Sequence, residues 1–383
     1  MEKKGALHGI TVLDISRMLP GPFCTMVLAD HGARVITIED KRFEKEGSFP
    51  PSVNRNKEHM TLNLKSREGK EIFYRLVGNA DILVEGFRPG VAARLGVDYD
   101  TLKEKNPGLI YCSISGYGQT GPLRDRPGHD VNYLGVSGLL DQIGPKDGAP
   151  TIPGFQIADI AGGGLHGALG ILLALFDRTR TGRGQFIDIA MTDCCLPMLA
   201  VNMDLQRLTG ERPKRSDAFL SHGYAFYNTF ETRDGKYLTL GALEPHFWNT
   251  LCDHLGVPPH LSCLQLNKEK QGEIKAFMED TFKKKDRHEW ELELDQLPIC
   301  WGPVNTLEEA MESEVFSARQ MVVETVAPNG DREKTFGVPI KMSETPGSIR
   351  STPVGFGEST VKILEEVEFS RDDIDAFFTK EII

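Results

Sequence analysis

The first 120 residues alternate between short apolar runs and amphipathic stretches. Four runs rich in β-branched residues are typical of buried strands, and they lie at residues 9–16, 34–40, 81–87 and 109–118. Between them, apolar positions recur with helical spacing at residues 23–33, 66–80 and 97–108. Parallel strands need crossover connections, which are usually helices, so this order predicts an α/β fold with a parallel sheet and helices on both faces.

A glycine-rich apolar stretch at residues 159–179 predicts a buried helix, and a further strand is expected at 184–193. The most apolar part of the helix, residues 160–176, is shorter than the roughly 20 residues that cross a bilayer. We therefore expect a core helix and no membrane span.

The character of the chain changes after residue 200. Residues 201–220 are polar and are expected to form a linker, and residues 222–243 read as a hairpin around Asp234 and Gly235. Helical patterns follow to about residue 320, so a small α+β domain is predicted at 221–325. A second linker at 326–329 would return the chain to a large domain, and that domain would comprise residues 1–200 and 330–383.

Composition narrows the class of protein. Hydrophobic residues make up 40% and charged residues 26%, as in ordinary globular proteins. The formal charge of −11, with no basic run interleaved with aromatics, argues against nucleic-acid binding. The amino terminus does not resemble a secretory signal, and the seven cysteines lack metal-binding spacing. These features favour a cytoplasmic protein with reduced thiols and no structural metal.

The sequence GGGLHG at residues 162–167 has the spacing of a dinucleotide-binding fingerprint, and Asp188 follows about twenty residues later. The fingerprint belongs in the first βα turn of a nucleotide-binding unit, whereas this copy lies mid-chain, so nicotinamide or flavin binding is not expected. The glycines would instead let a ligand approach the backbone at a helix N-terminus. Asp159 would sit at the N-cap, either as a simple cap or as a carboxylate facing that ligand.

Several motifs resemble the family III CoA-transferases and α-methylacyl-CoA racemases over residues 7–357. They are GITVLDIS, PGP, LADHGARVITIE, NRNKEHMTLNLKS, ADILVEGFRPGVAARLG, SISGYGQTGPLRDRPGHD, QIADIAGGGLHGALG and SETPG. The resemblance implies an interlocked homodimer with a Rossmann-like large domain, a small α+β domain and two crossing linkers. It also implies an acyl-CoA thioester substrate and no cofactor beyond the CoA that the substrate carries.

Within this superfamily, the residues around His129 have the racemase form Gly-His-Asp-x-Asn-Tyr, and GALEP places Glu244 at the matching racemase position. The implied catalytic set is His129, Asp159 and Glu244, acting by 1,1-proton transfer on 2-methyl-branched acyl-CoA. His129, oriented by Glu244, would serve the S proton, and Asp159 would serve the R proton. Helix amides after Asp159 would stabilise the enolate oxygen.

Two other functions remain open. In a CoA-transferase, Asp159 would be the nucleophile that carries CoA as an aspartyl thioester between carboxylic acids. A non-catalytic acyl-CoA-binding protein would need none of these residues. Taken without the resemblance, His129 would be an ordinary loop histidine and Glu244 a solvated carboxylate.

The resemblance also assigns substrate contacts. The residues expected to bind CoA or to line the substrate site are Ser16, Arg17, Met18, Lys65, Arg67, Arg88, Arg94 and Tyr133. Tyr133, with Asp130 and Asn132, is further expected to brace the loop. Thr37 stands where the family usually has a basic residue, so Lys41 or Arg42 would have to supply that contact.

Overall fold

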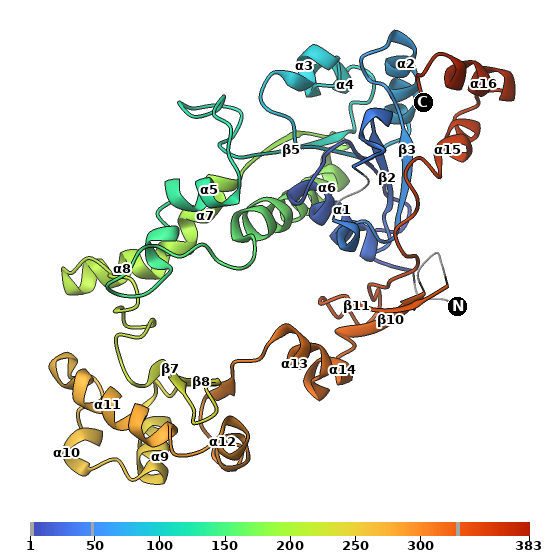
Figure 1. Cartoon of the computed structure of the whole chain (residues 1–383). Coiled ribbons are helices and arrows are strands. Elements are labelled where there is room, and N and C mark those ends of the chain that lie inside the picture. The colour runs from blue at the N-terminus through green and yellow to red at the C-terminus, as the bar shows by residue number, and fades with distance from the viewer. Residues whose placement is uncertain (1–3, 47–49, 327–329) are drawn as a thin grey trace. The chain divides into compact units, whose positions relative to one another are not determined.

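The computed structural model of this chain describes residues 4–46, 50–326 and 330–383 (Figure 1). It divides into a large unit, formed by residues 1–139, 153–199 and 314–383, and a small unit, formed by residues 140–152 and 200–313. The chain re-enters the large unit at Glu314, earlier than the expected linker at 326–329, of which residues 327–329 lie outside the described part. Helix α8 (Ala200–Thr209) takes up half of the other expected linker, 201–220.

The large unit is built on a six-stranded sheet of order β3-β2-β1-β4-β5-β6, in which all neighbouring strands are parallel. The strands are β1 (Thr11–Asp14), β2 (Arg34–Glu39), β3 (Lys57–Thr61), β4 (Ile82–Glu85), β5 (Ile110–Ser115) and β6 (Phe186–Ala190). The helices that follow these strands within residues 1–199 are α1 (Pro20–Asp30), α2 (Arg67–Gly78), α3 (Val91–Leu95), α4 (Tyr99–Lys103), α5 (Asp130–Val136), α6 (His166–Thr181) and α7 (Met191–Cys195). The predicted α/β fold with a parallel sheet is confirmed.

Strand β3 is not marked by an apolar run in the sequence. Its Lys57 and His59 are buried, yet each has polar partners within the unit. The Lys57 ammonium contacts the Asp14 carboxylate at 3.5 Å and donates to the Pro22 carbonyl at 2.8 Å. These long-range partners offset the cost of burying polar groups, which explains a strand with an atypical sequence.

The glycine-rich stretch forms a π-helix, η4 (Ala158–Leu165), which continues directly into α6. Its glycines serve packing rather than ligand approach. A Cβ on Gly163 would lie 2.7 Å from Pro20 Cβ, and one on Gly164 would lie 2.7 Å from Phe23 Cδ1. The expectation that these glycines open the backbone to a ligand is therefore wrong, because α1 and α7 occupy that space.

The combined helix, residues 158–181, is also longer and less buried than expected. By length and composition it could cross a membrane, although 39% of its most apolar window is buried within the protein. Five apolar side chains on it are 43–65% exposed: Leu165, Leu169, Leu172, Leu173 and Phe176. One face of the helix thus packs in the core while another is an exposed apolar stripe.

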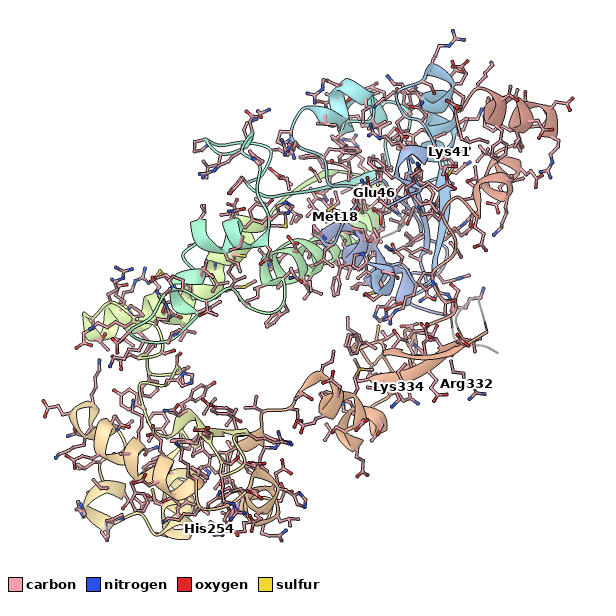
Figure 2. All side chains as sticks on the ribbon, in the orientation of Figure 1. Met18, Lys41, Glu46, His254, Arg332 and Lys334 are labelled. Atoms are coloured by element: carbon pink, nitrogen blue, oxygen red, sulfur yellow. The ribbon has the colours of Figure 1, made fainter. Side chains whose placement is uncertain are left out.

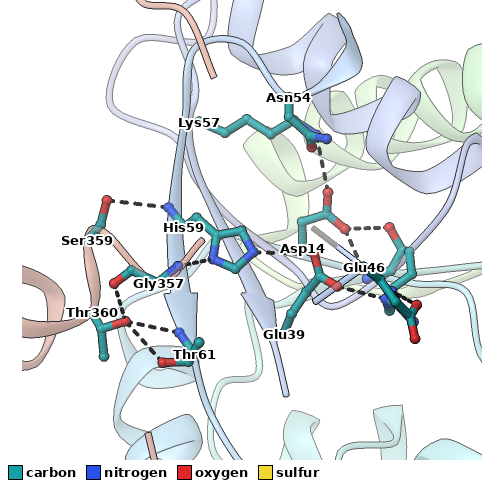
Figure 3. Close-up of polar contacts among 12 residues, drawn as sticks. Asp14, Glu39, Glu46, Asn54, Lys57, His59, Thr61, Gly357, Ser359 and Thr360 are labelled. Carbon is teal, nitrogen blue, oxygen red and sulfur yellow. Dashed lines mark hydrogen bonds and ion pairs between the residues drawn. The ribbon is translucent and has the colours of Figure 1, made fainter. Parts of the chain in front are cut away.

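The carboxyl-terminal segment completes the large unit along β3. Gly357 N–H donates to His59 Nδ1 at 2.9 Å, and Thr61 N–H donates to the Thr360 hydroxyl at 3.0 Å (Figure 3). Helices α15 (Thr360–Glu366) and α16 (Arg371–Thr379) follow, and Ile363 and Ile374 join the same apolar core as β1 to β5. Before these helices, α14 (Glu314–Ala318) leads into the two-stranded antiparallel sheet of β10 (Val322–Val326) and β11 (Arg332–Phe336).

The small unit contains the predicted hairpin as β7 (Tyr227–Glu231) and β8 (Tyr237–Gly241), with β9 (Trp301–Pro303) added antiparallel to β8. Its helices after the hairpin are α9 (Pro245–Leu255), α10 (Pro259–Ser262), α11 (Gln271–Phe282), α12 (Arg287–Leu294) and α13 (Leu307–Glu312). An aromatic core that includes Phe226, Trp248 and Trp290 stabilises it.

Candidate active site

Two of the three predicted catalytic residues, His129 and Asp159, line the same cavity of the large unit, which has a volume of about 780 Å³. His129 is the N-cap of α5, and its backbone N–H donates to Asn132 Oδ1 at 3.0 Å, which fixes the turn. Its ring is exposed. Asp159 lies in the first turn of η4 rather than at the expected N-cap, because the N-cap is Ile157, two residues earlier.

Asp130 links the two segments. Its buried carboxylate accepts a hydrogen bond from the backbone N–H of Asp159 at 3.0 Å. The next amide, that of Ile160, donates to the Gln156 carbonyl at 3.1 Å. These two first-turn amides are therefore already paired and are not free donors for an enolate oxygen, contrary to the simplest expectation.

The Asp159 carboxylate is half-buried. Burial, reinforced by the negative charge of Asp130, raises its pKa to about 6, while the nearby His129 opposes the rise. A carboxyl group with this pKa exchanges its proton readily near neutral pH. The cavity therefore holds an imidazole and a carboxyl, the two kinds of side chain that most often act in general acid–base catalysis.

Tyr133 holds the loop that carries His129 in place. It is buried, and its hydroxyl donates to the Gly128 carbonyl at 2.5 Å. A Cβ at Gly116 would lie 2.3 Å from its ring, so this position must be glycine. Burial, with a smaller contribution from the charge of Asp159, raises the pKa of Tyr133 to about 12, against the opposing charge of Arg88. The exposed Arg88 thus lies within electrostatic range of Tyr133, on the catalytic side.

The rest of the cavity wall is mostly apolar. Phe23, Met26 and Val27 of α1 line it together with Leu19, the N-cap of that helix, and residues 336–340 line it as well. Arg55 also lines the cavity, but its guanidinium is paired with Asp30 at 2.6 and 3.0 Å and donates to the Phe336 carbonyl. The cavity is suited to a hydrophobic group that ends near His129 and Asp159.

A second, basic pocket of about 500 Å³ lies at the carboxyl ends of β1 and β4, which is the usual ligand side of such a sheet. Five of the residues assigned to CoA line it: Ser16, Arg17, Met18, Lys65 and Arg94. Arg67 does not; its side chain is 83% exposed and pairs with Glu71 at 3.7 Å. Arg88 is likewise outside the residues that line this pocket.

Arg17 is held in place by residues that the sequence did not single out. Its guanidinium donates to Glu39 at 2.7 Å and to Glu46 at 2.9 Å, and lies 3.5 Å from the centre of the Phe43 ring. Glu39 also contacts His59 Nε2 at 3.3 Å (Figure 3). Because Gly357 N–H donates to Nδ1, the ring proton is on Nε2, facing Glu39. No local motif marks this chain of contacts.

Of the two candidate substitutes for the basic residue missing at position 37, Arg42 lines the basic pocket, whereas the Lys41 ammonium lies 5.9 Å from the centre of the Phe378 ring. Thr37 itself is buried in β2, and its hydroxyl has no hydrogen-bond partner. Arg42 is therefore the better placed of the two.

Met18 lines both the apolar cavity and the basic pocket, and it is the one residue that the two share among those described. Its side chain is 54% exposed, and its backbone has a φ of +71°, a conformation that non-glycine residues rarely adopt. Such strain is typical of functional sites. Figure 2 labels Met18 together with Glu46, the partner of the preceding Arg17.

Glu244, the third predicted catalytic residue, belongs to the small unit. It precedes α9, its backbone is extended and its side chain is exposed. Among the described residues, no group of three or more His, Cys, Asp or Glu side chains could hold a metal ion.

The chain is similar to known proteins over nearly its whole length. The sequence profile described as CoA-transferase family III matches residues 7–360. The α-methylacyl-CoA racemase of Homo sapiens is 37% identical over 99% of this chain and 97% of its own length. The succinyl-CoA:glutarate CoA-transferase of Mus musculus is 31% identical over 94% of this chain and 86% of its own length. A crystal structure of a CAIB/BAIF family protein from Brucella suis superposes with a TM-score of 0.83 at 30% identity, covering 96% of this chain and all of that one.

Proposed function

Because this chain belongs to CoA-transferase family III, we propose that it is a racemase or epimerase of 2-methyl-branched acyl-CoA thioesters. His129 and Asp159 would exchange the proton at C2 through an enolate. The observation that carries this proposal is that the two proton-carrying groups line one apolar cavity, with the pKa of Asp159 raised to about 6.

The proton balance is simple. For the S substrate, neutral His129 removes the C2 proton, the electron pair moves to the thioester oxygen, and protonated Asp159 returns a proton to the opposite face. For the R substrate the roles reverse, so one turnover leaves the pair ready for the other enantiomer. The raised pKa of Asp159 supports this because a carboxyl must be both proton donor and acceptor near neutral pH.

The alternative is CoA transfer between carboxylic acids, with Asp159 as nucleophile. The related succinyl-CoA:glutarate CoA-transferase is named for two dicarboxylates, each of which carries a second carboxylate. Among the described residues that line the apolar cavity, the one Arg or Lys is Arg55, and Asp30 already neutralises it. Burying an unpaired carboxylate there would be costly, which favours an apolar acyl group over a dicarboxylate.

We also propose that the protein is a homodimer located in the cytoplasm. The exposed apolar stripe of Leu165, Leu169, Leu172, Leu173 and Phe176 supports burial against a second copy. In such a dimer, Glu244 would orient the His129 imidazole. The seven cysteines, which are all free thiols, agree with a reducing compartment.

Proton NMR of 2-methylacyl-CoA with the enzyme in D₂O tests the reaction. A racemase introduces deuterium at C2 and destroys stereochemical purity. A transferase leaves C2 unlabelled and moves CoA to an added free acid. If neither activity is detected, the protein is an acyl-CoA-binding protein without catalysis.

A further inference from the structure

The two carboxylates that anchor Arg17 in the basic pocket differ in burial. Glu39 is the last residue of β2, and its side chain is 6% exposed. Its Oε2 accepts a hydrogen bond from Arg17 Nε at 2.7 Å. Glu46, which pairs with the other side of the guanidinium, is 61% exposed, so water screens its charge. The buried Glu39 is therefore the firmer anchor of the two.

Burying a carboxylate is costly unless both of its oxygens are hydrogen-bonded, and His59 supplies the second bond to Glu39. His59 lies on the neighbouring strand β3, and its side chain is 4% exposed. Its Nε2 lies 3.3 Å from Glu39 Oε1, the oxygen that does not accept from Arg17. Its Nδ1 accepts the Gly357 N–H at 2.9 Å, so the ring proton is on Nε2 and faces the carboxylate (Figure 3). One ring thus has two separate contacts, one with the C-terminal segment and one with Glu39.

We infer that His59 is a positioning residue for substrate binding: it donates to Glu39, and Glu39 holds the Arg17 guanidinium ready for CoA in the basic pocket. This inference rests on the proposed function only in that the ligand of the pocket is taken to be CoA. His59 is outside the residues that line the pocket, so its effect reaches the ligand through two hydrogen bonds. Breaking its bond to Glu39 should weaken CoA binding without changing the rate of proton transfer.

Two conservative variants separate the two contacts of the His59 ring. The amide nitrogen of a glutamine can take the place of Nε2, so His59→Gln keeps a donor for Glu39 and loses the acceptor for Gly357. The amide oxygen of an asparagine can take the place of Nδ1, so His59→Asn keeps that acceptor and loses the donor. Titration calorimetry with CoA should show about three- to tenfold weaker binding in His59→Asn, which is within the effect of one net hydrogen bond. His59→Gln should change the affinity by less than about twofold.

Thr360→Val is the matched control for the C-terminal segment. The Thr360 hydroxyl accepts the Thr61 N–H at 3.0 Å, on the same strand as His59. Its partners among the described residues are Thr61 and Gly357, and Glu39 is not one of them. The variant should lower the free energy of unfolding in urea and leave CoA binding unchanged. Equal losses of CoA affinity in Thr360→Val and His59→Asn would give His59 a structural role alone and overturn the inference.

A double-mutant cycle locates the effect at Arg17. Arg17→Ala should weaken CoA binding by about 10- to 100-fold. In that background His59→Asn should weaken it no further, because the guanidinium through which His59 acts is gone. Steady-state kinetics should show the loss in His59→Asn as a higher KM with kcat unchanged.

Glu39→Asp tests the same link should His59→Asn fail to fold. It keeps the charge but shortens the side chain by one methylene, so it should weaken CoA binding by a factor similar to that of His59→Asn. Unchanged CoA affinity in either variant, equal losses in His59→Gln and His59→Asn, or additive losses in the cycle would each overturn the inference. Absence of C2 exchange in the wild type, with this pattern of CoA affinities intact, would refute the proposed reaction alone.

Discussion

The apolar cavity and the basic pocket differ in how their charged groups are held. In the basic pocket, Arg17 is paired with two carboxylates and stacked on Phe43, so its orientation is fixed before any ligand arrives. In the apolar cavity, no described residue donates a hydrogen bond to the Asp159 carboxylate, which is left half-buried beside another acid. Paired charges are stable and unreactive, whereas an unpaired carboxyl is ready to take and release a proton.

This difference assigns substrate binding mainly to the basic pocket and proton transfer to the apolar cavity. The basic pocket can contribute affinity through groups remote from the reacting carbon, and such affinity can position the thioester in the apolar cavity. Substitutions in the two regions should therefore affect different kinetic constants, in a graded order of size.

The largest effects should come from the apolar cavity. His129→Ala and Asp159→Ala should each lower racemisation by about two to four powers of ten, the usual contribution of a positioned acid or base. C2 exchange should be lost most severely from the S substrate in His129→Ala and from the R substrate in Asp159→Ala. Both are measured by deuterium incorporation. The control Asp125→Ala removes a carboxylate that is 80% exposed near the same loop and should change little.

Near-normal racemisation in His129→Ala would remove the proposed distinction between the two regions. A transferase would show a different pattern, since Asp159→Ala would abolish activity and His129→Ala would hardly matter. Glu244→Gln should resemble a milder His129 lesion if the small unit orients the imidazole.

A smaller effect is expected from the basic pocket. Arg94→Ala should raise KM for the acyl-CoA by about 10- to 100-fold, the range for a hydrogen bond to a charged group, with kcat nearly unchanged. Arg67→Ala is the matched control, because its exposed side chain lies outside the pocket, and KM should change less than about twofold. Steady-state kinetics on both variants would decide the point, and equal effects would contradict the assignment of the pocket.

The pH dependence of C2 exchange should follow the ionisation of the Asp159 carboxyl. Exchange from the R substrate needs ionised Asp159, whose pKa is raised to about 6 by burial and by Asp130. The exchange rate should therefore rise with pH up to about 6 and fall by about tenfold per pH unit below it. Deuterium exchange between pH 4.5 and 8 measures this, at values where circular dichroism shows the fold intact. An acid limb near pH 4 would mean that the carboxyl is solvated like an ordinary aspartate.

The smallest expected effect concerns the free energy of unfolding, and it comes from Met18, which lines both the apolar cavity and the basic pocket. Met18→Gly and Met18→Ala remove the same side chain, but glycine relieves the positive φ that alanine retains. The glycine variant should therefore be the more stable by about 1 kcal/mol in urea unfolding. Equal stability of the two variants would show that the strain is relieved locally.

The elements that could be predicted from the sequence are those with local signals. Strands β1, β2, β4 and β5 are runs of β-branched residues, and His129 and Asp159 stand in distinctive motifs. Strand β3 could not be predicted, since Lys57 and His59 become strand residues only through partners far away in the chain.

Contacts between residues far apart in the sequence also explain the errors at the site. The glycines of η4 could not be assigned to packing before Pro20 and Phe23 were placed against them. Nor could the raised pKa of Asp159 be anticipated, because it depends on burial and on Asp130, 29 residues away. Arg67 and Arg94 are both basic residues in matching motifs, and only the fold separates the exposed one from the one in the pocket.

The carboxyl-terminal segment along β3 has a consequence for biosynthesis. The sheet of the large unit begins at residue 11, yet the groups that pair with His59 and Thr61 belong to residues 357–360. Between them the ribosome must make the whole of residues 200–313, which at 5–20 residues per second takes roughly 6 to 23 seconds. During that interval the small unit can fold on the emerging chain. The large unit still lacks residues 357–360, so its strand β3 remains uncovered. A nascent chain arrested before residue 357 should therefore recruit chaperones through that strand, and release of the last residues should end the association.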